Sequence, residues 1–549
     1  MAQRNQFTRR RFVGLLSSGM AAVTLLAAAP KRVSADTIHV PKDHKSIQAA
    51  IDTASPGDSV LVAAGTYRER LRLKESVTLR SAGDDAKGKL GLKRAEATII
   101  DGGGKEGDGP GVAMAEGATL DGFTVTNVGM YDEAEWNKHH ATHGNDQPHE
   151  HIGEPGTAGI SVIGVTCSIK HNIVHHIGYT GIAIQGVESK RCAPQVLHNV
   201  CYRNMGGGIG SMRGSTAVIE ANICFQNFYA GIGHEGSSPL VVNNDCHENI
   251  RAGIGISESS KPVVRGNRCH HNRRAGIGIR TGADTSPIVE DNDCHHNDMA
   301  GIGCEEDCTP LLRNNRCHEN TLAGIGCRDN ARPVIVGNHC FKNQAVGIGF
   351  DETKSSHAVV INNRLADNDK VAIGIHSGWK VRIIGNELSR PEGMPPVVMV
   401  FKGAEADFTD NTIRGSGVAG IRTEGIVRAA GNTFESPALR AGGPPQFAVW
   451  GLPGSSIVFT DNTVRGWRHG LFADKSAVTA CENRIVNYGQ VGIKITNPTT
   501  TAVIVGNRFE SETDREGVNV TGGQAIVENN HVEKPKPSGV KDTDPSKPQ

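Results

Sequence analysis

Residues 244–257 read NDCHENIRAGIGIS, and the next copies read NRCHHNRRAGIGIR at 267–280 and NDCHHNDMAGIGCE at 292–305. The same motif, with its leading glycine, recurs six times in succession. The steps between these glycines are 22, 23, 25, 23 and 23 residues, and degenerate copies extend the series from Gly159 to Gly517. The six leading residues are Gly231, Gly253, Gly276, Gly301, Gly324 and Gly347. A repeat of this length predicts a solenoid whose units stack on one another.

Each repeat contains three short pieces rich in Val and Ile, separated by Gly and Asn. PVVRGN from Pro262, NRCHHN from Asn267 and AGIGIR from Ala275 are one such set. Pieces of this kind are typical of strands joined by tight turns. The sequence therefore predicts an all-β, single-domain, right-handed parallel β-helix with about 24 residues and three strands per coil. A leucine-rich repeat would show its Leu pattern, and a propeller blade needs about 40 residues or more.

Three columns of equivalent residues support this register. The central Cys of each coil predicts an interior column of buried thiols from Cys201 to Cys340, and an Asn two residues earlier predicts an amide ladder from Asn199 to Asn338. The residue between them alternates in charge on four consecutive coils, as a solvent-facing column should. These four are Asp245, Arg268, Asp293 and Arg316. Side chains at strand spacing suit disulfides poorly, and thirteen Cys is an odd number, so we expect structural thiols.

Both ends of the chain have their own character. Residues 1–35 contain the arginine cluster Thr8–Phe12 (TRRRF), an apolar stretch at 13–29 and the small residues Val33-Ser34-Ala35. Together they resemble a twin-arginine signal peptide, which predicts export to the periplasm or beyond. The 549-residue chain has 58 basic and 58 acidic residues, and the signal holds six of the basic ones and no acid. The remaining 52 against 58 give a net charge of −6, which argues against a nucleic-acid binder. No apolar run of 18 residues follows residue 35, so we expect no membrane span, and residues 533–549 are expected to be a disordered tail.

The β-helix is predicted to occupy residues 36–532, with a cap and first coil at 38–70. Ile47, Ala50, Ile51 and Ala54 share one face of a short helix that could cover the first coil.

A resemblance to a known family rests on the repeats and on three segments, SIQAAIDTASPGDSVLVAAGTYRE, ATIIDGGG and ATLDGFTVTNVG. In these elements the chain resembles the pectin-lyase-like β-helix superfamily. The resemblance is to its carbohydrate-binding and sugar-hydrolysis members, including periplasmic copper-binding proteins that mature nitrous oxide reductase. It implies a fold and says little about activity.

The two glycines of each motif predict a bare strip of backbone along the helix axis, which a linear polymer could occupy. If both glycines face outward, they form a shallow groove with charged residues at its edge. The predicted groove comprises Gly231, Gly233, Gly253, Gly255, Gly276, Gly278, Gly301, Gly303, Gly324, Gly326, Gly347 and Gly349, with Glu235, Glu258, Glu305, Glu306, Asp329 and Glu352. Candidate catalytic residues for a uronate lyase, which needs a base and cations that neutralise a carboxylate, are Arg280, Arg328, Asp351, His376 and Lys402.

An insertion of about 26 residues interrupts the repeat at 130–158, because TLDGFTVTNVG (119–129) aligns with SIKHNIVHHIG (168–178) and lacks this segment in the later copy. It is rich in histidine, which predicts a metal site for Cu²⁺ or Zn²⁺. The candidate ligands are His139, His140, His143, Asp146, His149, Glu150 and His151. A lyase could instead use Ca²⁺. A second histidine set, with a weaker case for metal binding, directly follows the Cys column at His247, His270, His295 and His318. Stacked outward rings there would stabilise the sheet without further function, and adjacent histidines could also share a metal adventitiously.

Three functions stay open at this point. The leading hypothesis is an exported β-helix that binds or processes an extracytoplasmic polysaccharide as a lyase, hydrolase or epimerase. The first alternative is a periplasmic metal-binding accessory protein that uses the His-rich loop. The second is a structural surface protein without catalysis. Whether the chain is an enzyme, which metal it holds and its oligomeric state are left undecided by the sequence.

Overall fold

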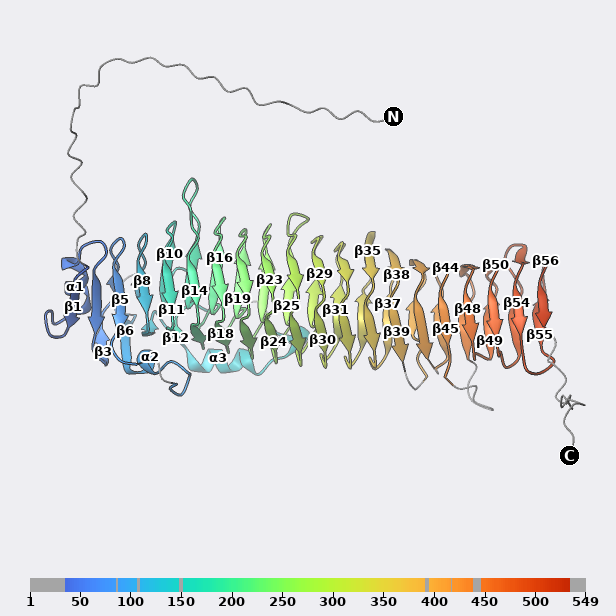
Figure 1. Cartoon of the computed structure of the whole chain (residues 1–549), viewed down its shortest axis with the longest axis horizontal. Coiled ribbons are helices and arrows are strands. Elements are labelled where there is room, and N and C mark those ends of the chain that lie inside the picture. The colour runs from blue at the N-terminus through green and yellow to red at the C-terminus, as the bar shows by residue number, and fades with distance from the viewer. Residues whose placement is uncertain are drawn as a thin grey trace, which may run out of the picture.

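The computed structural model describes residues 35–84, 87–105, 109–147, 152–390, 394–415, 417–437 and 446–533. These residues form a long stack of coils, each made of up to three short strands (Figure 1). Every strand pairs in parallel with the equivalent strand of the next coil, which confirms the predicted parallel β-helix with three strands per coil. The predicted export segment at 1–34 and the tail from 534 onward lie outside the described residues, and the last strand includes Glu533.

Sheet A holds 20 of the described strands. The strands are β1 (Thr37–Val40), β2 (Ser59–Val62), β5 (Thr78–Ser81), β8 (Thr119–Asp121), β11 (Ser168–Lys170), β14 (Gln195–Leu197), β17 (Val218–Glu220), β20 (Leu240–Val242), β23 (Val263–Arg265), β26 (Ile288–Glu290), β29 (Leu311–Arg313), β32 (Val334–Val336), β35 (Ser356–Ile361), β38 (Trp379–Ile384), β41 (Glu405–Thr409), β44 (Ile426–Ala430), β47 (Ser456–Thr460), β50 (Ala477–Cys481), β53 (Ala502–Val505) and β56 (Ala525–Glu528).

Sheet B contains the strands that carry the Cys column. They are β3 (Gly65–Arg68), β6 (Thr98–Gly104), β9 (Thr124–Val128), β12 (Ile173–Ile177), β15 (Val200–Tyr202), β18 (Ile223–Phe225), β21 (Asp245–His247), β24 (Arg268–His270), β27 (Asp293–His295), β30 (Arg316–His318), β33 (His339–Phe341), β36 (Arg364–Ala366), β39 (Glu387–Arg390), β42 (Thr412–Gly415), β45 (Thr433–Glu435), β48 (Thr463–Arg465), β51 (Arg484–Val486), β54 (Arg508–Glu510) and β57 (His531–Glu533).

Sheet C contains the glycine motif. Its strands are β4 (Leu71–Arg72), β7 (Val112–Ala113), β10 (Ile160–Ile163), β13 (Ile182–Gln185), β16 (Ile209–Met212), β19 (Ile232–Glu235), β22 (Ile254–Ser257), β25 (Ile277–Ile279), β28 (Ile302–Cys304), β31 (Ala323–Cys327), β34 (Val346–Phe350), β37 (Val371–Ile375), β40 (Val398–Val400), β43 (Ala419–Thr423), β46 (Phe447–Gly451), β49 (His469–Asp474), β52 (Val491–Thr496) and β55 (Glu516–Thr521).

The helices are short and lie at one end or outside the stack. They are α1 (Ile47–Thr53), α2 (Lys93–Ala97), α3 (Glu133–His140) and the 3₁₀ turn η1 (Gly144–Asp146). Ser46 caps α1 by accepting a hydrogen bond from the Ala49 amide, and Ile47 and Ile51 are fully buried against the first coil. This helix therefore covers the first coil, as its apolar face predicts.

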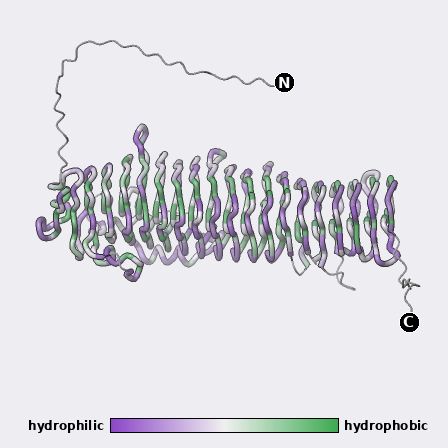
Figure 2. The backbone as a smooth tube through the Cα atoms, viewed as in Figure 1, coloured by the Kyte–Doolittle hydropathy of each residue, from purple (hydrophilic) through white to green (hydrophobic). Residues whose placement is uncertain are grey.

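The interior is a narrow column filled by equivalent residues of successive coils. Figure 2 shows hydrophobic and hydrophilic residues alternating along each coil, as strands with one buried face require. The seven predicted thiols pair in register from one coil to the next and are buried. All thirteen cysteines are free, and all except the half-buried Cys481 are buried. Burial raises the pKa of Cys224 and Cys246 well above the usual range, so these thiols stay protonated. The predicted interior column is confirmed.

The asparagine ladder is longer than predicted and is accompanied by a second one. Between Asn172 and Asn530, each side-chain amide donates to the Oδ1 of the next, at 2.8–3.0 Å. A second ladder, from Asn204 to Asn368, has bonds of 2.9–3.1 Å and was missed by the sequence reading. The two ladders flank the Cys column and satisfy buried carbonyl groups at both turns next to sheet B.

Candidate functional site

The second glycine of each motif lies on the outer face of sheet C. These residues pair in register along β19, β22, β25, β28, β31 and β34. A Cβ built on Gly233 would meet nothing within 4 Å, and one on Gly278 would meet only the Ala252 methyl, at 3.7 Å. We call this column the glycine strip; it comprises Gly233, Gly255, Gly278, Gly303, Gly326 and Gly349. Half of the predicted bare backbone is therefore present.

The leading glycine of each motif does not face solvent, so this part of the prediction is wrong. A Cβ on Gly276 would lie 2.7 Å from the Gly301 carbonyl oxygen and 2.9 Å from the Asn297 side-chain nitrogen. The chain turns there from sheet B into sheet C, and the next coil and the second asparagine ladder leave no space for a side chain. The buried residues are Gly231, Gly253, Gly276, Gly301, Gly324 and Gly347.

The predicted charged edge of the strip is present as a single column at the end of the sheet C strands. Arg280, Arg328 and His376 follow β25, β31 and β37 at equivalent positions, since their amides bond to the preceding coils in the same register. In chain order the column consists of Glu235, Ser257, Arg280, Glu305, Arg328, Asp351 and His376, and Lys402 lies one position beyond it. Glu258, Glu306, Asp329 and Glu352 are exposed in the following turn.

Arg328 is held by its neighbours rather than left available to a ligand. Its guanidinium donates to Glu305 at 2.7 Å and lies 3.4 Å from Asp329. Burial alone would lower the pKa of Arg328, but the bond to Glu305 and the nearby acids raise it. His376 is also engaged, because its ring stacks on Phe401 with centroids 4.0 Å apart. The alternating charges at this edge therefore partly neutralise one another.

The opposite edge of the strip carries cations that the sequence reading missed. Tyr229, Arg251 and Arg274 occupy equivalent positions on consecutive coils, two residues before the leading glycine, and their backbones are joined by hydrogen bonds. The Arg251 guanidinium lies 4.5 Å from the Tyr229 ring centroid. The sequence signal for these residues is their fixed position two residues before the leading glycine, which holds Tyr, Arg and Arg on three successive coils.

Arg251 and Arg274 interact electrostatically with charged residues on the far edge of the glycine strip. Burial, with the charges of Arg274 and Arg280, lowers the pKa of Arg251 to about 10. Burial likewise lowers the pKa of Arg274, which also senses Glu305 and Arg328 on the opposite edge. Arg251 therefore stays charged at neutral pH, as guanidinium groups in proteins generally do. The strip is therefore a floor of bare backbone with Arg251 and Arg274 at one edge and alternating charges at the other.

Large side chains replace glycine at one end of this surface. In register with Gly374, the next coils place Met399, Arg422, Trp450 and Phe472 on the outer face of sheet C. The Arg422 guanidinium lies 5.6 Å from the Trp450 ring centroid. The bare strip thus ends at a wall of aromatic and cationic side chains.

The described residues of the insertion at 130–158, which are 130–147 and 152–158, form a strap that runs along the outside of several coils (Figure 1). Asp132 caps α3 by accepting bonds from the Ala134 and Glu135 amides, both at 3.0 Å. Trp136 is buried among Met205, Phe228 and Ile250 from three successive coils. Its indole donates to the Gln226 carbonyl at 3.1 Å. The strap is therefore docked by its own small apolar core at the corner between sheets B and C.

The histidines proposed as metal ligands have separate partners in this strap. His139 is buried, faces the Phe228 ring edge-on and bonds Glu135 at 3.0 Å. His140 stacks on Trp136, and His143 contacts Asp298 at 2.6 Å. Within the described part of the chain, no three His, Cys, Asp or Glu side chains are arranged to hold a metal.

The other four predicted metal ligands lie later in the insertion. Asp146 belongs to η1, while His149, Glu150 and His151 lie outside the described residues. The loop metal site, whether for Cu²⁺, Zn²⁺ or Ca²⁺, therefore stays a prediction.

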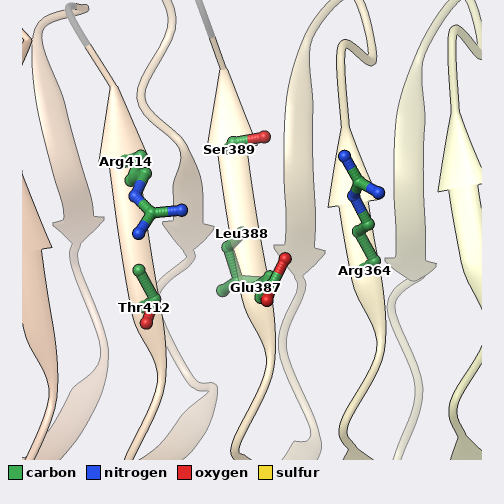
Figure 3. A pocket seen from close by; sticks show the side chains of 6 residues that line it. All are labelled: Arg364, Glu387, Leu388, Ser389, Thr412 and Arg414. Atoms are coloured by element: carbon green, nitrogen blue, oxygen red, sulfur yellow. The ribbon is translucent and has the colours of Figure 1, made fainter.

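A small hollow lies on sheet B, away from the glycine strip. It has a volume of about 140 Å³ and is formed by three neighbouring strands (Figure 3). Arg364, Glu387, Leu388, Ser389, Thr412 and Arg414 line it. Arg414 is already paired with Glu435 at 2.8 Å. Sites for small molecules usually have about 300–1,000 Å³, so this hollow does not suit a buried ligand.

Comparison with known proteins agrees with the fold. No curated protein sequence matches the chain. The periplasmic alginate epimerase AlgG is 15% identical, with a TM-score of 0.41 over 63% of this chain and 82% of that one. Pre-mature gene product 12 of bacteriophage phi29 is 12% identical, with a TM-score of 0.43 over 89% and 71%. Pectate lyase Pel9A is 12% identical, with a TM-score of 0.31 over 64% and 79%.

These distant likenesses carry no argument about activity. A family model described as a right handed beta helix region matches residues 149–289, 275–394 and 396–544. The matched segments cover well over half of the sequence. No described helix is both long and apolar enough to cross a membrane. The chain belongs to the family of right-handed β-helix proteins.

Proposed function

We propose that this chain is an exported protein that binds a linear acidic polysaccharide along the glycine strip. The main support for this proposal is the arrangement of Arg251, Arg274 and Arg280 around bare backbone on consecutive coils. Backbone without side chains lets an extended chain approach closely. Guanidinium groups bind carboxylates in a fixed, often bidentate geometry, so a polymer with one carboxylate per sugar suits this surface.

The groups at the charged edge support a proposal about chemistry as well as binding. A lyase or epimerase removes the proton next to a uronate carboxylate, which requires a base and a cation that stabilises the resulting negative charge. Asp351 and His376 are the candidate bases, and Arg280, Arg328 and Lys402 are the candidate cations. Arg280 is exposed and forms no ion pair with a carboxylate among the described residues, whereas Arg328 must first release Glu305. We therefore favour Arg280 as the residue that contacts the polymer.

Binding is tested with polygalacturonate and alginate as charged polymers and dextran as the neutral one. The Gly278→Phe variant fills the strip without displacing backbone, because a Cβ there meets only one methyl group. We expect this variant and Arg274→Ala/Arg280→Ala to weaken binding of the acidic polymers at least tenfold. Val263→Phe, on the outer face of sheet A, is the matched control and should bind normally. Equal binding by all variants, or equal binding of dextran, would contradict the proposal.

Catalysis is tested separately on the same polymers. Absorbance of unsaturated uronate products reports a lyase, and exchange of solvent deuterium into the sugar reports an epimerase. Asp351→Asn and His376→Gln should abolish either signal while polymer binding is retained. If binding is seen without either signal, the chain is a polysaccharide-binding protein and not an enzyme of these two classes.

A further inference from the structure

The outer face of sheet B carries a continuous stack of aromatic rings. It runs from Tyr202 to Phe341 with centroids 4.6–5.1 Å apart and nearly parallel planes. Four consecutive rings in its middle are imidazoles. They are His247, His270, His295 and His318. The stack places these imidazoles one per coil on a solvent-facing surface.

The charged residue of one coil contacts the imidazole of the next. Asp245 Oδ1 lies 3.0 Å from His270 Nε2, and Asp293 Oδ1 lies 2.9 Å from His318 Nε2. Between them, Arg268 Nε lies 3.4 Å from His295 Nε2. A carboxylate accepts a proton from Nε2, whereas a guanidinium can only donate to it. The alternating charges therefore give alternate histidines opposite tautomers.

Two coils carry a second histidine directly after the first. His271 and His296 have φ values of 55° and 53°, in the left-handed region, which turns each side chain back toward its predecessor. As a result the Nδ1 atoms of His270 and His271 lie 2.8 Å apart, and those of His295 and His296 lie 2.8 Å apart. Each coil thus presents a pair of imidazole nitrogens on one face.

We propose that the His270–His271 pair is a bidentate site for a divalent transition metal of tetragonal preference, Cu²⁺ or Ni²⁺. With metal–nitrogen bonds of about 2.0 Å, two ligands at 90° are separated by about 2.8 Å, whereas tetrahedral ligands would be about 3.3 Å apart. In the metal-free protein this separation is that of a hydrogen bond between the two nitrogens, and it equals the separation that a square arrangement requires once an ion displaces the shared proton to water. Because His270 is held by its stack and by Asp245, rotation of the exposed His271 ring about χ2, a soft torsion, directs the second lone pair at the ion.

Asp245 makes this pair a better metal ligand than a bare surface pair. By accepting the Nε2 proton of His270, it leaves the lone pair on Nδ1, where the ion binds. A carboxylate in this outer position orients the ring and increases its basicity, and its loss typically lowers metal affinity 10–100-fold. His271 is exposed, so water completes the coordination and the ion has a path of entry.

The other histidines of the face are less suited to an ion. Arg268 holds Nε2 of His295, so the Nδ1 of that ring carries the proton instead. Both nitrogens of His318 face carboxylates, from Asp293 and Glu319. The His175–His176 pair, whose Nδ1 atoms are 2.6 Å apart, is covered by Tyr131 and Tyr202. The protein therefore contains its own matched comparison, an equivalent pair with Arg268 in place of Asp245.

The test is a titration of the purified full chain with Cu²⁺ in glycine buffer, which competes for weak sites, followed by electron paramagnetic resonance. We expect His271→Ala to remove one bound ion and its two-nitrogen signature, and His296→Ala to leave both unchanged. Asp245→Asn should weaken that ion 10–100-fold. Arg268→Asp should add a second ion at His295–His296. Other histidines of the chain contribute equally to all variants, so the differences report this face alone.

Two results would overturn the proposal. One is an unchanged stoichiometry and spectrum in His271→Ala, and the other is an equal loss in His296→Ala. Circular dichroism and the thermal midpoint of each variant check that the fold is intact. These outcomes are independent of polysaccharide binding, because the glycine strip lies on a different sheet.

Discussion

At the scale of single residues, the interior of the coil holds one imidazole without a partner. His234 is only 2% exposed and neither ring nitrogen has a hydrogen-bond partner in the described structure. Equivalent positions on the neighbouring coils are occupied by Ser211 and Ile256. Burial lowers the pKa of His234 to about 3, so the folded protein keeps this ring neutral. A buried polar group of this kind costs stability, and it makes stability depend on pH.

The pH dependence has a definite sign. Below its ordinary pKa of 6.5, His234 takes up a proton only in the unfolded chain, so stability is lost as pH falls from 6.5 toward 3. Each pH unit in this window costs up to about 1.4 kcal/mol. We expect His234→Leu to raise the thermal midpoint more at pH 4.5 than at pH 7.5. A variant whose advantage is the same at both pH values would show that the ring is not buried and neutral.

The two glycines of each motif show what the sequence could and could not predict at this scale. Strand alternation places Gly278 outward, and the structure agrees. The same rule places Gly276 outward, but that residue lies before β25, where the chain turns, and strand alternation does not apply. The position of a corner depends on how the next coil packs, which a single repeat does not reveal. Arg251 and Arg274 were missed for a related reason, because their position beside the strip depends on how successive coils pack.

At the scale of elements, α3 is the one helix that lies along the side of the coils rather than at an end or turn. It has few intrinsic reasons to be stable, since it spans eight residues with a polar composition. Its stability comes from Trp136, which fills a pocket made by three coils, and from contacts of Arg203 with Glu133 and the indole. The sequence predicted an inserted loop here and assigned its histidines to metal. It could not show that two of those rings pack against Phe228 and Trp136.

Truncation of the indole should release the strap without unfolding the coils. We expect Trp136→Ala to cost about 3–5 kcal/mol of docking free energy, the usual range for a buried aromatic residue. Limited proteolysis should then cut within residues 130–158 while circular dichroism of the sheets is unchanged. Trp450→Ala, on the outer face of sheet C, is the matched control. Loss of the whole fold in Trp136→Ala would mean that the strap is part of the core.

At the scale of the whole molecule, the β-helix is a stack in which the described strands of each coil pair with those of the neighbouring coils. Its length and register were predictable because Asn, Cys and Gly recur at fixed positions, and a one-residue shift would expose the interior residues. The second asparagine ladder extends this logic, since both turns next to sheet B are held by amides from coil to coil. What the repeat cannot predict is which face meets a ligand, because all three sheets obey the same periodicity.

A stack of this kind should tolerate the loss of one complete coil. Deletion of residues 484–507 joins Asn483 to Arg508 and lets the remaining ladder asparagines keep their register. We expect a folded protein shortened by about 4.8 Å, measured by small-angle X-ray scattering. Deletion of 484–495 is the control, because it removes half a coil and should give an insoluble or unfolded product. Equal behaviour of the two deletions would show that register does not control folding.

The column of seven thiols gives this molecule a natural chemical probe of local opening in each of seven coils. Cys201, Cys224, Cys246, Cys269, Cys294, Cys317 and Cys340 mark seven consecutive coils, and each is buried and free. An alkylating reagent reaches a given thiol only when its coil opens. The order in which the thiols react, read by mass spectrometry, therefore maps local opening coil by coil without any added label. An enzyme or binding protein of another fold would need seven engineered probes to yield the same profile.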